Sequence, residues 1–389
     1  MGMVRSWRRP MVGRDRDETH RASTPLELLF DLCFVVAVAS AAAELHHALA
    51  ASHLGAGLFG FATSFFAIWW AWVNFTWFAS AYDTDDVPYR LLTLLQIAGV
   101  LVMAAGIPEA FEHRDFTVPT IGYVIMRVAM VIQWLRAARE HTAGRPAALR
   151  YALGISVVQL CWVVRLFLPG VWGWIGFGLF AVLELLVPVW AEYRGNRTSW
   201  HPNHIAERYG LFTLIVLGEC VLSATTAIQT AISESGLSAA LLVIAGSGLV
   251  LLFGLWWAYF KRDAAPRLRN SLKSTMVWAY SHYAVFGSVA AVGAGLGVVV
   301  DTEAGKTELP TYGAALAVAV PVVVYMVVVG LQHKIMNRDE PVALRYIVLG
   351  AVLILAAVLL PLPAAVAAMA VVSSLLVVYG VVVTSRFTL

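Results

Sequence analysis

Two carboxylates near the start of a long apolar stretch are the side chains of this sequence best placed to do chemistry. Glu27 and Asp31 fall in TPLELLFDLCFVVAVAS, residues 24–40. Because they are four residues apart, they share one face of a helix. A carboxylate inside hydrocarbon costs on the order of 3 kcal/mol or more unless a partner, water or an ion compensates it. The pattern therefore predicts a compensating group at this end of the helix.

Helix physics accounts for one of the two carboxylates. Thr24-Pro25-Leu26-Glu27 fits a capping box, with Thr24 as the N-cap, Pro25 as the first helical residue and Glu27 at the third position. Asp31 lies one turn deeper, where the helix dipole has faded. Asp31 is therefore the better candidate for function, and a structural salt bridge with an arginine is the main alternative.

A second acidic group follows the next apolar stretch. Asp83, Asp85 and Asp86 stand just before Pro88 and close to Arg90. They could gather a cation or pair with Arg90, although acidic runs in loops are usually solvated surface. Because they stand beside a predicted membrane entrance, a functional role is as well supported as a structural one.

Four ionisable residues fall deep inside apolar stretches: Arg127, Glu184, Glu219 and His282. Such residues must face the protein interior or a wet cavity. Arg127 with Glu184 or Glu219 suggests a buried ion pair, which could be purely structural. Glu219 and His282 have the chemistry of a proton relay, because their pKa values can move toward neutrality. A hydrogen-bonded core histidine is the commoner role for His282.

His201, His204 and Glu207 stand at a spacing of three residues before the seventh apolar stretch. Metal coordination is conceivable, but Pro202 interrupts the helical register and the spacing is not diagnostic. We interpret these residues as loop and interface chemistry. The three cysteines lack metal spacing, so the sequence predicts neither a metal nor a cofactor. No nucleophile motif indicates a catalytic residue, and no basic, aromatic patch indicates nucleic acid.

The composition places these residues in a membrane protein. Of 389 residues, 60% are hydrophobic and 13% are charged, whereas about a quarter of a soluble domain is charged. A spanning helix needs about 20 apolar residues. The all-α, polytopic fold that follows has twelve predicted helices, at about 26–45, 55–79, 89–107, 117–138, 147–166, 171–191, 204–229, 236–260, 272–299, 311–332, 342–360 and 363–385.

The distribution of Lys and Arg predicts the topology. With twelve helices and a cytoplasmic N-terminus, all but four of the 27 Lys and Arg residues fall in cytoplasmic tails and loops. The exceptions are Arg114, Arg165, Lys306 and the intramembrane Arg127. An eleven-helix arrangement would invert the second part of this pattern. We therefore expect a basic cytoplasmic tail over residues 1–23, two cytoplasmic termini and a bacterial inner-membrane location.

A faint internal repeat suggests two six-helix halves, residues 24–191 and 192–389. WWAW at 69–72 recurs as WWAY at 256–259. Glu27 corresponds to Glu207, and Gln96 to His282, at similar offsets. An even number of helices in each half predicts parallel repeats related by an axis along the membrane normal.

Several long motifs resemble those of one family. ELLFDLCFVVAVAS (27–40), the segment 69–111 that begins WWAWVNFTWF, HIAERYGLFTLIVLGECVLSA (204–224), LWWAYF (255–260) and SHYAVFGSVAAVGAGL (281–296) are similar to the bacterial low temperature requirement protein A (LtrA) family. The resemblance implies a multi-pass membrane protein, linked by name to growth in the cold, with no established activity. Its motif positions are Glu27, Asp31, Asp83, Asp85, Asp86, His204, Glu207, Arg208 and Glu219.

A weaker similarity connects residues 30–34 with a motif of a potassium channel family. Phe30-Asp31-Leu32-Cys33-Phe34 is similar to the Phe-Ser-Asp element on the first helix of a family with two sets of six helices. The serine of that element is missing here.

Two functions from different classes remain. The first is a transporter or channel for a small solute or ion, with or without proton coupling, and it predicts Asp31, Glu219 and His282 around a wet cavity. The second is a membrane-embedded enzyme acting on lipid or an apolar metabolite, which would explain the aromatic residues of segment 69–77. The enzyme ranks second because no nucleophile or metal motif supports it. A scaffold ranks third, and the sequence leaves association into an oligomer open.

Overall fold

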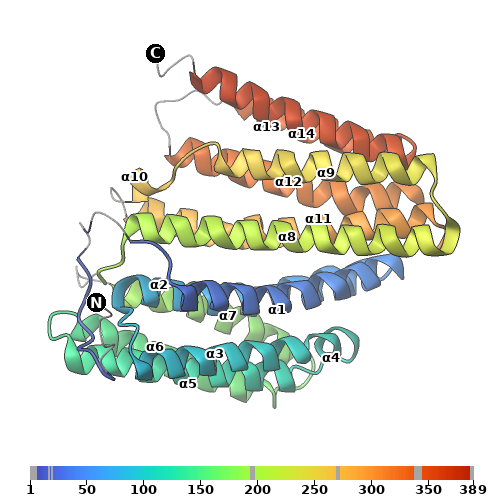
Figure 1. The fold of residues 1–389 in the computed structure, drawn as a ribbon. Coiled ribbons are helices and arrows are strands. Elements are labelled where there is room, and N and C mark those ends of the chain that lie inside the picture. The colour runs from blue at the N-terminus through green and yellow to red at the C-terminus, as the bar shows by residue number, and fades with distance from the viewer. Residues whose placement is uncertain are drawn as a thin grey trace. The chain divides into compact units, whose positions relative to one another are not determined.

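The computed structural model describes residues 7–15, 18, 21–192, 198–268, 272–336 and 344–385. Over these residues all regular structure is helical, as Figure 1 shows. Eleven of the described helices are long and apolar enough to cross a membrane. The fold is that of a polytopic membrane protein, as predicted. Residues 1–6 of the predicted basic tail and Arg386 of the C-terminal tail lie outside the described residues.

The helices follow the predicted segments closely. The long ones are α1 (Pro25–Ala50), α2 (Leu54–Tyr82), α3 (Val87–Ala105), α5 (Thr117–Glu140), α6 (Arg145–Arg165), α7 (Val171–Ala191), α8 (Pro202–Ser235), α9 (Ala239–Phe260), α11 (Leu272–Glu303), α12 (Thr311–Met336) and α14 (Leu362–Ser385). The twelfth apolar segment is shorter, formed by α13 (Leu344–Ala356) and the 3₁₀ turn η2 (Ala357–Leu359).

Two short helices were not predicted. They are α4 (Ile107–Glu112) and α10 (Ala265–Leu268). Gly106 separates α3 from α4, and Pro108 stands in the first turn of α4, where a proline is well tolerated. Asp263 accepts a hydrogen bond from the backbone N–H of Ala265 at 2.9 Å and so starts α10.

Two compact units divide the chain. The first consists of the residues up to Ser40 and Ala67–Arg208, and the second of Ala41–Phe66 and the residues from Tyr209 on. Helices α1, α2 and α8 each contribute to both units. In the first unit α5 packs against α3 and α6, and in the second α11 packs against α12 while α9 packs against α14. The two six-helix halves expected from the repeat stay a prediction.

Close helix packing in the second unit depends on glycines of α11. A Cβ atom added to Gly295 would lie 2.3 Å from the carbonyl oxygen of Ala317 on α12. One added to Gly293 would lie 3.1 Å from the sulfur of Cys220 on α8. Small residues of this kind allow helix backbones to approach in a membrane. Gly295 sits at the tighter of the two contacts.

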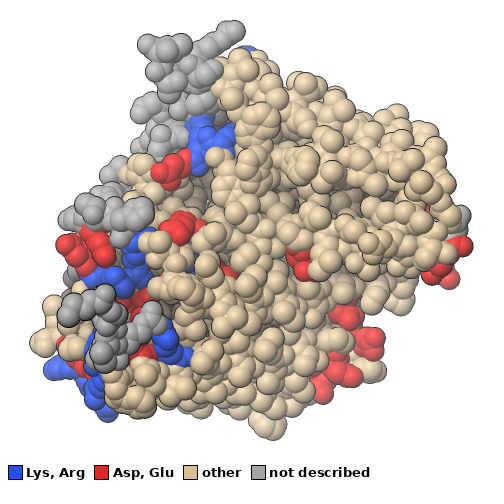
Figure 2. All heavy atoms as spheres, in the orientation of Figure 1, with Lys and Arg blue, Asp and Glu red and all other residues tan. Residues whose placement is uncertain are grey.

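Charged side chains gather mostly near helix ends. In Figure 2 most of the Lys, Arg, Asp and Glu side chains lie toward the ends of the helices, and the surface between them is largely uncharged. An uncharged band of this kind suits hydrocarbon, where an unpaired charge is costly.

A buried charge cluster in the first unit

The start of α1 is built by the predicted capping box. The backbone N–H of Thr24 donates to Oε2 of Glu27 at 2.8 Å, and the backbone N–H of Glu27 donates to the Thr24 hydroxyl at 3.3 Å. The capping role of Glu27 is therefore confirmed. Its side chain is nevertheless 0% exposed, so the carboxylate does more than cap an exposed helix end.

One guanidinium contacts both carboxylates of the opening motif. Arg208 on α8 places Nη1 3.1 Å from Glu27 Oε1 and Nη2 2.5 Å from Asp31 Oδ1. All three side chains are fully buried. The spacing of four residues aims both carboxylates the same way, so a single arginine can serve both. The arginine salt bridge considered as the alternative for Asp31 is thus formed, and its partner is Arg208, in the second turn of α8.

Two more basic side chains surround Glu27. Nε2 of His204, one turn before Arg208, lies 3.1 Å from Glu27 Oε1. Arg21 places Nη2 3.8 Å from Glu27 Oε1 and 3.7 Å from Oδ2 of Asp83, which follows the last residue of α2. We call these six residues the Arg208 cluster: Arg21, Glu27, Asp31, Asp83, His204 and Arg208.

The WWAW motif of α2 supplies hydrogen bonds to two buried carboxylates. Trp72 donates its indole N–H to Asp31 Oδ1 at 2.7 Å, and Trp70 donates to Glu184 Oε2 at 2.7 Å. Residues two apart on a helix point to nearly opposite sides. Each tryptophan therefore serves a different acid, and both rings are fully buried.

Glu184 on α7 accepts hydrogen bonds from several helices. Besides Trp70, it accepts from the Tyr123 hydroxyl at 3.1 Å and from the Trp162 indole at 3.2 Å. Arg127 on α5 lies 3.5 Å from Glu184 and also donates to the Tyr123 hydroxyl. The ion pair suggested for Arg127 is therefore formed with Glu184. We call this second group the Glu184 cluster, and its acid is held by three hydrogen bonds and one ion pair.

The three aspartates after α2 have separate partners. Asp85 accepts a hydrogen bond from Arg90 Nε at 2.7 Å, which is the pairing considered for this group. Asp86 is the N-cap of α3, accepting from the backbone N–H of Tyr89 at 3.0 Å, and it binds Arg136 through Nη2 at 2.5 Å. Only Asp83 joins the Arg208 cluster. A shared cation site formed by all three is not what the structure shows.

Asp83 and Asp86 have opposite electrostatic surroundings. Burial raises the pKa of Asp83 from 3.8 to about 6, with a further contribution from Glu27 that outweighs the opposing effect of Arg21. Burial also acts on Asp86, but hydrogen bonds from Arg136 and from the backbone of Arg9 and Tyr89 lower its pKa to about 2. Of these two carboxyls, Asp83 is therefore the one whose proton is exchanged nearer neutral pH.

The interpretation as loop residues holds for His201, which precedes α8, and is wrong for His204, which lies in its first turn. Both side chains are 0% exposed. Pro202 is the first residue of α8, where a proline fits, so it starts the helix and does not disrupt it. The His201 ring contacts the carbonyl of Glu18 at 2.9 Å. Glu207, in contrast, is exposed and accepts from the backbone N–H of Ser23 at 3.1 Å.

Glu219 and His282 belong to the second unit. Glu219 is half-buried on α8. His282 is fully buried on α11, with Nε2 2.9 Å from the Tyr259 hydroxyl and Nδ1 2.7 Å from the carbonyl of Trp278. These contacts fit a hydrogen-bonded core histidine. The convergence of Glu219 and His282 with Asp31 on one wet cavity stays a prediction, as do the pathway roles of all the candidate residues.

Sequence reasoning missed Arg21, a member of the Arg208 cluster, and Trp72, which donates a hydrogen bond to it. Arg21 falls in the tail that the sequence predicts to be cytoplasmic. It stands only three residues before the capping residue Thr24, and this places it near the start of α1. Trp72 stands out in the sequence only for its aromatic character, whereas its indole N–H is a donor. Among the described residues, no group of three or more His, Cys, Asp or Glu side chains is arranged to hold a metal ion. The residues of the Arg208 cluster can pair charges and exchange protons.

Comparison with known proteins agrees with the motifs. The sequence profile described as "Bacterial low temperature requirement A protein (LtrA)" matches residues 22–382. The chain is also 27% identical over 333 residues to "Uncharacterized protein RA0937" of Rhizobium meliloti (strain 1021), covering 78% of this chain and 75% of that protein. No solved structure matches. Because the profile covers nearly the whole chain, including every residue of the Arg208 cluster except Arg21, this protein belongs to the bacterial low temperature requirement A family.

Proposed function

We propose that this protein is a proton-coupled membrane transporter or channel for a small solute or ion, and that the Arg208 cluster binds the coupling proton. The observation that carries the proposal is the charge balance of the cluster. Glu27, Asp31 and Asp83 are three acids, whereas Arg21 and Arg208 are two permanent cations. With His204 neutral, one negative charge is left over within these six residues.

Neighbouring charges among the described residues do not remove this imbalance. Arg14 donates to the carbonyl of Asp83 at 3.1 Å, but its own guanidinium pairs with Glu18 at 3.5 Å. Arg90 and Arg136 are paired with Asp85 and Asp86. An uncompensated charge in a buried site is strongly unfavourable. One proton, on Asp83 or on His204, neutralises the cluster, and this is what a coupling site must bind and release.

The arrangement also couples that proton electrostatically to the other charges of the cluster. Arg21 lies 3.8 Å from Glu27 and 3.7 Å from Asp83, so it approaches both acids at distances beyond a strong hydrogen bond. His204 also contacts Glu27. A change of protonation at Asp83 therefore alters the charge that Arg21 and Glu27 experience, and Glu27 shares Arg208 with Asp31.

The enzyme alternative rests on the aromatic residues of segment 69–77. Two of these, Trp70 and Trp72, have another role, because they are fully buried hydrogen-bond donors to Glu184 and Asp31. A scaffold role still ranks last, because it gives no reason for so many charged residues deep in the protein. We place the protein in the bacterial inner membrane, with both termini in the cytoplasm, on the distribution of Lys and Arg.

Proteoliposomes that contain a pH-sensitive dye test the proposal. Under an inside-negative potential, wild-type protein should acidify the interior of the vesicles. The assay is run with and without a mixed pool of metabolites as possible solutes. Asp83→Asn should slow the rate of acidification at least tenfold. Asp85→Asn is the matched control, because Asp85 is two residues away and pairs outside the cluster. Infrared difference spectra across pH 5–7 should show a protonated carboxyl band that Asp83→Asn removes. Equal wild-type and Asp83→Asn spectra would contradict the assignment.

A further inference from the structure

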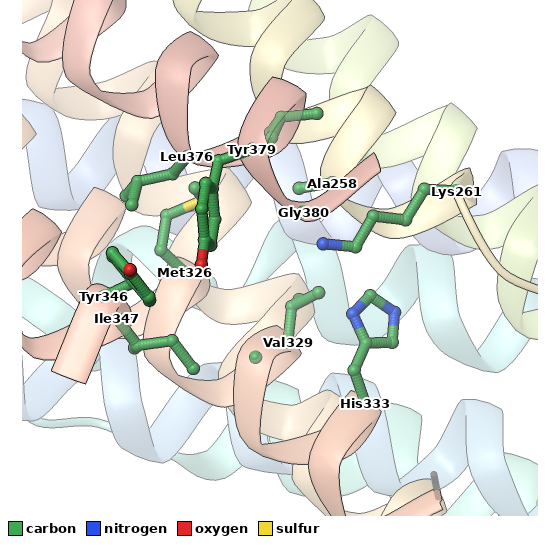
Figure 3. Close-up of a pocket in the computed structure, with 12 residues that line it drawn as sticks. Ala258, Lys261, Met326, Val329, His333, Tyr346, Ile347, Leu376, Tyr379 and Gly380 are labelled. Carbon is green, nitrogen blue, oxygen red and sulfur yellow. The ribbon is translucent and has the colours of Figure 1, made fainter. Parts of the chain in front are cut away.

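Helices α12, α13 and α14 and the end of α9 line a pocket in the second unit that has no part in the Arg208 cluster (Figure 3). Its volume is about 50 Å³. Since one water needs roughly 15 Å³ on this measure, the pocket holds a few waters or one small polar group. Met326, Val329, Ile347 and Leu376 form its apolar wall.

The polar groups of the pocket are basic or neutral. Lys261, His333, Tyr346 and Tyr379 line it, and none of the described residues that line it is Asp or Glu. Lys261 is the C-cap of α9 and His333 stands in the last turn of α12, where helix dipoles favour cations. In Figure 3 the ammonium of Lys261 reaches into the space above His333. This charge pattern selects an anionic group.

Neighbouring residues strengthen the positive field. Lys334 and Arg345 are adjacent in sequence to His333 and Tyr346, and Arg345 lies over the Tyr346 ring, 5.0 Å from its centre. Asp263, two residues after Lys261, is engaged in starting α10. The described surroundings of the pocket are thus more basic than acidic.

A glycine of α14 leaves room for the ammonium of Lys261. A Cβ atom added to Gly380 would lie 2.9 Å from Nζ of Lys261. Lys261 therefore lies directly beside the backbone of α14, at the edge of the pocket.

The surface beside the pocket faces lipid. Val348 and Leu349 on α13 are 53% and 52% exposed, and Leu375 and Val378 on α14 are 63% and 44% exposed. In a membrane-spanning chain such side chains contact acyl chains. The loops 261–273 and 334–345, which flank the pocket in sequence, are the ones predicted to be cytoplasmic. Basic pockets between helices on that side suit phospholipid headgroups.

We propose that this pocket binds the phosphate of an anionic phospholipid. Lys261 and His333 pair with the phosphate, the hydroxyls of Tyr346 and Tyr379 donate hydrogen bonds to it, and the acyl chains lie along α13 and α14. Free inorganic phosphate has the same headgroup chemistry, so the experiment must separate the two sources.

Binding to the full-length protein in detergent tests the proposal. Short-chain phosphatidylglycerol, phosphatidylcholine with the same chains, and inorganic phosphate are titrated separately by calorimetry. We expect phosphatidylglycerol to bind at least tenfold more tightly than either of the others. Lys261→Gln and His333→Gln should each weaken it at least fivefold. Lys334→Gln is the matched control, since Lys334 is exposed and does not line the pocket.

Each other outcome overturns part or all of the assignment. Inorganic phosphate binding as tightly as phosphatidylglycerol would make this a free-anion site. Equal binding of both lipids would remove the role of the headgroup charge. Unchanged phosphatidylglycerol binding in the variant at position 261 would refute the site. If that variant does not fold, unchanged binding in the variant at position 333 would refute it.

Discussion

Trp72 donates its indole N–H to the buried carboxylate of Asp31, 2.7 Å away and 41 residues earlier in the chain. The contact joins α2 to α1 inside the first unit and leaves Asp31 with two donors, Trp72 and Arg208. A hydrogen bond to a charged group contributes about 1.5–3 kcal/mol. This bond therefore has a measurable effect on stability.

Replacing Trp72 by Phe should lower the free energy of unfolding by about 2 kcal/mol, because Asp31 loses a donor that no solvent replaces. Trp256→Phe is the matched control. Trp256 occupies the corresponding motif on α9 but is 46% exposed, so its replacement should change stability by less than about 0.5 kcal/mol. Unfolding by SDS in mixed micelles measures both. Equal effects would show that ring size matters and the indole N–H does not.

Replacing Arg208 by Gln should be far more damaging. It leaves Glu27 and Asp31 buried without a guanidinium, at a cost of about 3–5 kcal/mol. Adding Asp31→Asn to Arg208→Gln should restore part of this loss, because one of the unpaired charges is removed.

Arg90→Gln is the control for the Arg208 variant. Its ion pair with Asp85 has exposed side-chain fractions of 40% and 25%, so its loss should cost less than about 1 kcal/mol. Thermal unfolding in detergent, followed by tryptophan fluorescence, ranks the variants. Additive losses in the double variant at positions 31 and 208 would show that the two residues are not coupled.

The pKa shifts of Asp83 and Asp86 predict opposite effects of pH on the folding stability. The pKa of Asp83 rises on folding from 3.8 to about 6, so its stabilising contribution is full below 3.8 and is lost as the pH rises through about 6. The pKa of Asp86 falls to about 2, so its contribution is present above 3.8 and is lost as the pH falls through about 2. At about 1.4 kcal/mol per pKa unit, the Asp83 contribution is on the order of 3 kcal/mol.

Stability measured from pH 4 to 7 tests the Asp83 contribution. Wild-type protein should lose stability across this range relative to Asp83→Asn, whose amide does not titrate. Asp85→Asn should follow the wild-type curve. A wild-type curve parallel to that of the Asp83→Asn variant would mean that Asp83 titrates normally.

Gly295→Ala should destabilise the second unit strongly, because its Cβ would lie 2.3 Å from a backbone oxygen of α12 that cannot move alone. Overpacking of this kind typically costs about 1–3 kcal/mol. Gly246→Ala on α9 is the control, since no atom lies within 4 Å of its added Cβ. That variant should be neutral or gain up to about 1 kcal/mol of helix propensity. Expression level and melting temperature in detergent distinguish the two.

The sequence predicted the helices and some of the contacts well, for local reasons. A run of apolar residues identifies a membrane helix, and the Thr24–Glu27 capping box is formed within four residues. The spacing of Glu27 and Asp31 predicted that both carboxylates lie on one face of the helix. The arginine that serves them could not be identified, because which loop or helix end meets α1 is set by the packing of helices far apart in sequence.

Burial was the other quantity that could not be predicted well from the sequence. His204 and Arg21 stand among polar residues, and the sequence pattern predicts solvated segments for both. In the structure each is buried against Glu27 because the tail and the start of α8 pack on the same end of α1 and α2. Trp256 and Trp257 show the reverse, since they copy the buried motif of α2 and are exposed.

The contact between Asp31 and Arg208 spans 177 residues, and this separation sets the order of events during synthesis. At about 5–20 residues per second, roughly 9–35 s pass between translation of the acid and of its arginine. During that interval α1 already holds both carboxylates, and Trp72 is the earlier partner to emerge. The nascent first helix therefore needs a chaperone, a proton or the translocation channel itself to shield its acids until α8 arrives.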